Sequence, residues 1–221
     1  MSDVTDQDKG PDPAAELAID DWVLKVDRLG KVFGPQDPAA IADTGPEFGT
    51  SKSPTTGSVV AAWDVSFEVA AGEAIGVIGE SGSGKSTVMR SIAGDHGSSA
   101  GSVYLRRSDG TVEDILTLDG ASRRKLRIDQ LSVVYQDPSE GLDLGVTAGG
   151  NVAERLTAAG WRHFGQIRER ASELLSRTEV PLERMDDIVR QFSGGMRQRV
   201  QLAKALANRP RSAARRRCRR P

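Results

Sequence analysis

The chain has 221 residues, of which 38% are hydrophobic and 28% charged, and its formal net charge is −1. This composition provides enough apolar residues for a packed core and excludes a wholly disordered chain. No apolar run approaches the roughly 20 residues of a membrane-spanning helix, and the N-terminus lacks the layout of a signal peptide. The single cysteine, Cys218, excludes an internal disulfide and argues against a cysteine-based zinc site. We therefore expect a soluble, cytoplasmic protein with one domain of ordinary size, or one domain with a smaller lobe.

Charge is concentrated at the two ends of the chain. Residues 1–21 carry seven acids and one lysine, and residues 211–221 carry six arginines and no acid. We interpret residues 1–20 as a disordered acidic tail and residues 211–221 as a solvated basic tail. A nucleic-acid-binding arm is the alternative for the arginines. No aromatic residues or known binding fold stand beside them, so no direct contact with nucleic acid is expected.

The first half of the chain predicts mainly strands. DWVLKVDRL at 21–29 and SVVAAWDVSFEVA at 58–70 are strand-like, and Val65, Phe67 and Val69 of the second share one face. The intervening residues 34–58 are rich in Gly, Pro, Ser and Thr and predict a long loop.

Shorter apolar runs follow. EAIGVIG at 73–79 predicts a strand, and KSTVMRSIAG, which begins at Lys85, predicts a helix. GSVYLR at 101–106 and DILTL at 114–118 predict short strands around the turn Ser108-Asp109-Gly110, and LSVVYQ at 131–136 predicts another strand.

The last third of the chain has helical spacing. Residues 147–178 place one set of residues on a common face: Phe164, Ile167, Ala171, Leu174 and Leu175. A further helix is predicted after Ser193 and ends near Asn208-Arg209-Pro210. Its apolar face is predicted to consist of Met196, Val200, Ala203, Leu206 and Ala207.

A phosphate-binding loop is the strongest chemical signal in the sequence. The pattern G-x-x-x-x-G-K-[ST] is met, between a predicted strand and a predicted helix, by Gly79, Glu80, Ser81, Gly82, Ser83, Gly84, Lys85, Ser86 and Thr87. Glycines let successive backbone N–H groups turn toward an anion, and the N-terminus of the helix adds its positive end. Lys85 is expected to contact the β- and γ-phosphates and Ser86 to ligate Mg²⁺. A glycine-rich turn with a chance lysine is the alternative.

A second motif selects a family. FSGGMRQR at 192–199 opens the last predicted helix and resembles the signature motif of ATP-binding cassette (ABC) proteins. Ser193 suits an N-cap, and Gly194 and Gly195 leave backbone donors free. The resemblance implies that these three residues face the γ-phosphate held by the second cassette of a dimer. An ordinary serine-capped helix is the alternative.

The resemblance covers roughly residues 21–210 and assigns two further positions. Gln136 occupies the place of the family's Q-loop glutamine, which contacts Mg²⁺ and the attacking water. Phe33 occupies the place of the aromatic ring that stacks on adenine. A turn-forming glutamine and a core phenylalanine are the alternatives for these two residues.

The family resemblance implies an α/β fold and an ATPase function. We expect a P-loop core with a mixed sheet, an antiparallel β lobe over 21–118 and a helical subdomain at about 137–193, which docks a permease or complex partner. AGGNVAERL at 148–156 is similar to the ATP-binding subunits of phosphonate carbon–phosphorus (C–P) lyase systems, and dipeptide and nickel importers share the other features. The implied cofactors are ATP and Mg²⁺. The implied location is the cytoplasm, at the inner face of the membrane where a permease is the partner.

The sequence departs from the family after Pro210. The family continues there with an apolar strand ending in Asp-Glu, the Walker B motif, whereas this chain reads RSAARRRCRRP. Neither His96 nor His163 occupies the place of the family's switch histidine. We interpret the chain as a truncated or frameshifted cassette, incomplete at its C-terminus and impaired in hydrolysis. An evolved short cassette is the alternative interpretation, and a non-hydrolysing nucleotide-binding or assembly module is the alternative function.

Overall fold

The structure is a computed structural model that describes residues 22–107, 109–208 and 212–215. The acidic tail predicted at 1–20 lies outside the described residues, as do Arg209, Pro210 and residues 211 and 216–221 of the basic tail.

An antiparallel sheet forms the first half of the molecule, as expected. Its strands are β1 (Trp22–Phe33), β2 (Val59–Ala70), β3 (Ala100–Arg106) and β4 (Val112–Asp114), in the order β2-β1-β3-β4. Val26 of β1 lies opposite Phe67 on one side and Val103 on the other. Val65, Phe67 and Val69 pack against the buried cluster of this lobe, as their alternation predicts.

Two details of this lobe correct the sequence-based predictions. The loop 34–58 contains helix α2 (Pro38–Ala42), with Asp37 as N-cap and proline at the first position, and the 3-10 helix η1 (Pro46–Phe48). The strand predicted at 114–118 is instead β4, which ends at Asp114. The Asp114 carboxylate accepts from the N–H groups of Leu116, at 3.0 Å, and Val103, at 3.2 Å, and so bends the chain where the strand was expected to begin.

The strand predicted at 73–79 is not formed. Residues 73–80 have no regular secondary structure, and Ile78 is 95% exposed. The apolar pattern of residues 73–79 is typical of a strand that is buried on both faces. A strand also needs hydrogen-bonding neighbours, and no strand in the described part of the chain pairs with this segment.

A two-stranded parallel sheet lies apart from the antiparallel one. It joins β5 (Leu131–Val134) to β6 (Ser212–Arg215), with Leu131 opposite Ser212. The strand expected at 131–136 is therefore confirmed but ends two residues early. β6 corrects the prediction for the end of the chain: residues 211–221 were expected to form a solvated tail, but residues 212–215 form a strand.

Beside the predicted helix α3 (Lys85–Ile92), the described part of the second half of the chain contains four helices and short 3-10 helices. α4 (Gly120–Asp129) was not predicted. The region 147–178 is not one helix but two, α5 (Ala148–Ala158) and α6 (Phe164–Arg177), and α7 (Gly194–Ala205) begins after Ser193 as predicted. The 3-10 helices are η2 (Pro138–Glu140), η3 (Leu182–Arg184) and η4 (Val189–Gln191).

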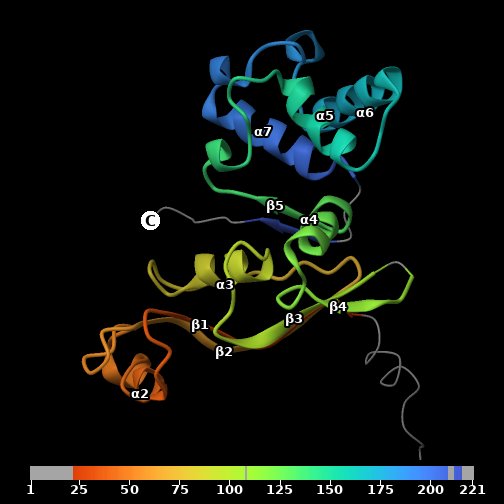
Figure 1. Ribbon diagram of the computed structural model, residues 1–221. Coiled ribbons are helices and arrows are strands. Elements are labelled where there is room, and N and C mark those ends of the chain that lie inside the picture. Colours follow the sequence, from red (N-terminus) through yellow and green to blue (C-terminus); the bar gives the residue numbers. More distant parts are fainter. Residues whose placement is uncertain (1–21, 108, 209–211, 216–221) are drawn as a thin grey trace, which may run out of the picture.

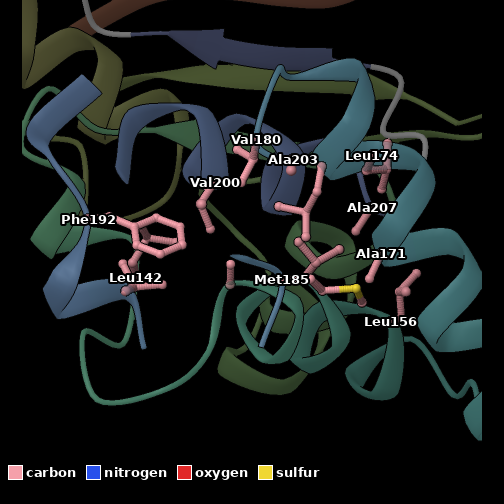
Figure 2. Close-up of a cluster of buried hydrophobic side chains, with 14 residues drawn as sticks. Leu142, Leu156, Ala171, Leu174, Val180, Met185, Phe192, Val200, Ala203 and Ala207 are labelled. Carbon is pink, nitrogen blue, oxygen red and sulfur yellow. The ribbon is translucent and has the colours of Figure 1, made fainter. Parts of the chain in front are cut away.

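The molecule is layered around two hydrophobic clusters. Helices α5, α6 and α7 lie on one side of β5 and β6, whereas α3 lies between these strands and the antiparallel sheet (Figure 1). The helical cluster, which includes Leu174, Val200 and Phe192, is shown in Figure 2. The second cluster joins α3 and α4 to β1 and β3. Two predicted core residues are exceptions, since Phe164 and Leu206 are exposed.

Candidate nucleotide-binding site

The phosphate loop leads directly into α3. Lys85, the first residue of the helix, turns its ammonium back into the loop, where Nζ donates to the carbonyl oxygens of Gly79 at 2.8 Å and Glu80 at 2.5 Å. A third bond reaches Ser83 Oγ at 3.1 Å. The loop is also closed by the Ser83 N–H, which donates to the Glu80 carbonyl at 3.2 Å. The lysine and the loop backbone therefore form one compact, positively charged unit at a helix N-terminus.

Gly84 fixes this unit against the antiparallel sheet. Its φ is +83°, in the left-handed region, and a Cβ at this position would lie 1.9 Å from the carbonyl oxygen of Ala61 in β2. Only glycine combines that backbone conformation with so close an approach. The loop is thereby placed against one end of β2.

Phe33 lies near the same end of β2. It is the last residue of β1 and pairs with Val59, which is two residues, about 7 Å, from Ala61 along β2. Phe33 is 43% exposed. The ring of His96 meets it edge-on at 6.1 Å between centroids, and Lys31 Nζ lies 5.1 Å from its centroid. The structure thus brings an accessible aromatic ring and the phosphate loop to one end of the β lobe.

Gln136 follows the end of β5 and is exposed. The next residue, Asp137, caps η2 by accepting from Ser139 N at 2.9 Å. This backbone hydrogen bond is the main reason that the pKa of Asp137 lies below its ordinary value. An ion pair of 2.8 Å between Arg90 of α3 and Glu140 of η2 connects the segment that follows Gln136 to the phosphate-loop helix.

Ser193 is the N-cap of α7, with its Oγ accepting from Met196 N at 3.3 Å, and Ser193, Gly194 and Gly195 are all exposed. No hydrogen bond or ion pair between described residues joins them to the phosphate loop. The phosphate loop and Phe33 therefore lie near one end of β2, and the Arg90–Glu140 ion pair links the segment after Gln136 to the helix that follows the loop. The start of α7 is a separate exposed surface.

Contacts between distant segments were not visible in the sequence. Arg90 and Glu140 are 50 residues apart, and a buried glutamine, Gln201, contacts the backbone of Tyr135. Arg197, Gln198 and Lys204 lie at helical spacing from Gln201 and are polar or charged, so no apolar period in the sequence indicated that Gln201 is buried. Within the residues that the structure describes, no cluster of three or more His, Cys, Asp or Glu side chains could hold a metal ion.

The glycine-rich loop at the start of α3, in an α/β fold, places the chain in the P-loop class of proteins. A family model described as ABC transporter matches residues 63–213, and the chain belongs to that family. It is 42% identical over 147 residues to the putative phosphonates utilization ATP-binding protein PhnK of Escherichia coli (strain K12). The matched region covers 66% of this chain and 56% of that protein. It is also 35% identical over 147 residues to a putative peptide import ATP-binding protein of Brucella ovis, and that matched region covers 66% of this chain and 44% of that protein.

Solved cassettes share the fold. The dimeric ATP-binding cassette MJ0796 bound to ADP and Pi superimposes with a TM-score of 0.67 at 28% identity, over 85% of this chain and 70% of that one. The chain spans about half the length of the curated relatives that it matches. None of the helices in the described ranges is both long enough and apolar enough to cross a membrane.

Proposed function

We propose that the chain is an ATP-binding subunit of an ABC-type system and binds Mg-ATP at residues Gly79–Thr87. One observation carries this proposal: Lys85 sits inside a glycine loop at the N-terminus of α3, with its ammonium held by loop atoms. Loop amides, helix dipole and lysine together suit a triphosphate. When phosphate binds, Lys85 exchanges at least one of these contacts for a phosphate oxygen, which forms a charge-assisted hydrogen bond.

The other site residues receive roles from their positions and chemistry. Phe33 offers a partly exposed ring for the adenine base. Ser86 and Gln136 carry neutral oxygen donors, and these fit Mg²⁺, which prefers a few protein oxygens together with phosphate oxygens and water. Bound there, the cation would neutralise part of the phosphate charge. Ser86 and Gln136 would orient the cation, and the loop amides would hold the phosphates.

The system served is proposed to be phosphonate utilization or peptide import. Both suggestions come from the names of relatives that the chain matches over about half of their length. The alternative that the sequence supports is a C–P lyase complex in place of a membrane permease. Either partner is reached from the cytoplasm, at the inner face of the membrane in the case of a permease.

Two partner surfaces are proposed. The exposed start of α7, at Ser193, Gly194 and Gly195, would face the nucleotide of a second cassette, and MJ0796 is dimeric in its solved structure. The helical unit would dock the permease or complex subunit. Support for the second surface is a hollow of about 440 Å³ beside α6, lined by residues that include Arg168 and Leu182.

A second candidate function is nucleotide binding without hydrolysis. The strand that follows α7, β6, reads Ser-Ala-Ala-Arg, and residues 211–221 contain no acid. A carboxylate that polarises water is therefore missing from this stretch, and catalysis depends on interactions that strengthen in the transition state. This observation favours a binding or assembly role for the chain as written.

Fluorescent-ATP binding and phosphate release, measured on the same purified sample, test both functions. We expect Lys85→Ala to weaken Mg-ATP binding by about tenfold or more, since it removes a charged partner of the phosphates. Lys125→Ala on the exposed face of α4 is the matched control. Unchanged affinity in Lys85→Ala would overturn the binding site. Phosphate release close to background supports the non-hydrolysing function, and release at a normal cassette rate that depends on Lys85 supports the ATPase.

The proposed dimer surface is tested by Ser193→Arg. The change removes the cap of α7 and places a bulky cation at the helix end, so ATP-driven dimerisation should be lost while first-site binding stays nearly unchanged. Light scattering with and without Mg-ATP measures this. Dimerisation equal to that of the parent chain would reduce the motif to an ordinary helix start.

A further inference from the structure

Gln201 makes a backbone-like contact at the end of strand β5. It lies on α7 and is 2% exposed. With its carboxamide oriented by hydrogen bonding, Nε2 donates to the Tyr135 carbonyl at 2.9 Å and Oε1 accepts from the Tyr135 N–H at 3.1 Å. Both hydrogen-bonding groups of one backbone residue are thus bound by one side chain, 66 residues further along the chain.

This contact lengthens the β5 ladder by one residue. The last described pair of β5 with β6 places Val134 opposite Arg215. No strand among the described residues pairs with Tyr135, and the planar amide of Gln201 supplies the donor and acceptor that a strand would supply. The slot is narrow, because a Cβ at Gly141 would lie 2.3 Å from the terminal amide of Gln201.

Gln136 lies between two anchored neighbours. Tyr135 is held by Gln201 on one side, and Asp137 is held on the other as the cap of η2, with Oδ1 accepting from Ser139 N and Oγ at 2.9 and 2.7 Å. When the backbone on both sides of a residue is fixed, the direction of its Cα–Cβ bond is fixed too. The position of the Gln136 side chain therefore depends on Gln201.

The same helix is tied to β5 at a second point. Ser132 Oγ donates to the carbonyl of Ala205 at 2.7 Å, so a later residue of α7 meets an earlier residue of β5. The helix and strand run in opposite directions, and the start of α7 extends about 10 Å beyond Gln201, past the end of the strand. Any shift of α7 along this direction is passed to Tyr135 through the Gln201 amide.

We propose that Gln201 is a positioning residue that holds Gln136 in place for Mg²⁺-dependent ATP binding and couples it to the signature helix α7. The proposal rests on the proposed function, in which Gln136 contributes to the Mg²⁺ site. Gln201 acts through the backbone of Tyr135 and touches neither nucleotide nor metal.

Amide hydrogen exchange and Mg²⁺-dependent affinity test this on the full chain. In Gln201→Leu we expect the Tyr135 amide to exchange roughly two- to tenfold faster, the range for one lost hydrogen bond. Affinity for fluorescent ATP should fall by a similar factor with Mg²⁺ and stay unchanged in EDTA. Gly141→Ala, which displaces the Gln201 amide by steric contact alone, should reproduce both effects. Gln166→Leu, the same change on the exposed face of α6, should reproduce neither.

A double variant separates positioning from a merely structural role. If Gln201 acts through Gln136, Gln201→Leu should cause no further loss of Mg²⁺-dependent affinity in a Gln136→Ala background. A further loss there, or equal losses with Mg²⁺ and in EDTA, would overturn the proposal. If the parent chain binds no ATP, the proposed function fails, and the exchange data still decide the backbone contact: unchanged exchange at Tyr135 overturns it.

Discussion

Gly84 is the residue at which the phosphate loop, the first turn of α3 and strand β2 meet. Its φ of +83° and the 1.9 Å approach of a notional Cβ to the Ala61 carbonyl make two separate demands for glycine. Gly82, in the same loop, makes only the first demand, since its φ is +86° and no atom lies within 4 Å of a notional Cβ. The two glycines therefore form a natural pair for separating backbone strain from steric contact.

Gly84→Ala should destabilise the chain more than Gly82→Ala. Left-handed backbone strain applies to both and is worth about 1–2 kcal/mol. Only Gly84→Ala must also push a strand carbonyl away, so we expect it to lower the free energy of unfolding by about 1–3 kcal/mol more. Urea denaturation followed by circular dichroism measures the difference. Equal losses in the two variants would show that the loop does not pack on β2.

At the scale of elements, a polar segment with a local cap forms a helix, whereas an apolar segment without a partner strand forms no strand. Helix α4 forms although its sequence is strongly polar, because Asp119 accepts from the N–H groups of Ala121 at 2.8 Å and Ser122 at 2.9 Å. The apolar segment 73–80 forms no strand, because the described chain supplies no neighbour for it. A cap needs partners a few residues away, whereas a strand needs a partner from elsewhere.

The cap of α4 should make stability depend on pH. The pKa of Asp119 is lowered, first by the backbone N–H of Ser122. Since the folded pKa lies below the unfolded one, its contribution is complete above about pH 4, the ordinary value for aspartate, and is lost as the pH falls through the folded pKa. We expect Asp119→Ala to lower Tm at pH 7 and to lower it less at pH 3.

Thermal melts at the two pH values measure this effect. Glu169→Ala, on the exposed face of α6, is the control for loss of a surface acid. A Tm deficit in Asp119→Ala that is the same at both pH values would contradict an ionised cap.

At the scale of the whole molecule, Arg155 joins the two hydrophobic clusters. It lies on α5 of the helical unit, and its Nη2 donates to the Leu131 carbonyl at 2.8 Å and to Ser132 Oγ at 2.9 Å, both on β5. It also donates to the Arg127 carbonyl at the end of α4. Burial lowers the pKa of Arg155, yet a guanidinium stays charged at neutral pH, so these bonds remain charge-assisted.

Arg155→Met should separate the helical unit from the rest. The variant removes the charged donor from the partly buried carbonyls of Arg127 and Leu131, and we expect a loss of about 2–3 kcal/mol in the free energy of unfolding. Hydrogen exchange should then show α5, α6 and α7 opening before β1 and β3. Arg162→Met, whose partners Thr157 and Trp161 are local, should change stability by less than about 0.5 kcal/mol. Concerted exchange of both clusters in Arg155→Met would contradict this coupling.

The sequence by itself determined the features that depend on neighbours in the chain. The loop from Gly79 to Thr87, the start of α7 at Ser193 and the alternation in β2 were all predictable, because phosphate loops, caps and strand faces are written in spacings of a few residues. The same local rules also gave the α/β class and the family resemblance, which the family model over residues 63–213 confirms.

Only the tertiary structure decided which segments meet. It paired β6 with β5, gave residues 73–80 no partner strand within the described ranges, exposed Phe164 and brought Gln201 to Tyr135. The physical reason is common to all four. A strand pairing, a buried face or a buried amide becomes favourable only when a distant segment supplies the matching surface or hydrogen bond, and that match is a property of the folded chain and not of any local pattern.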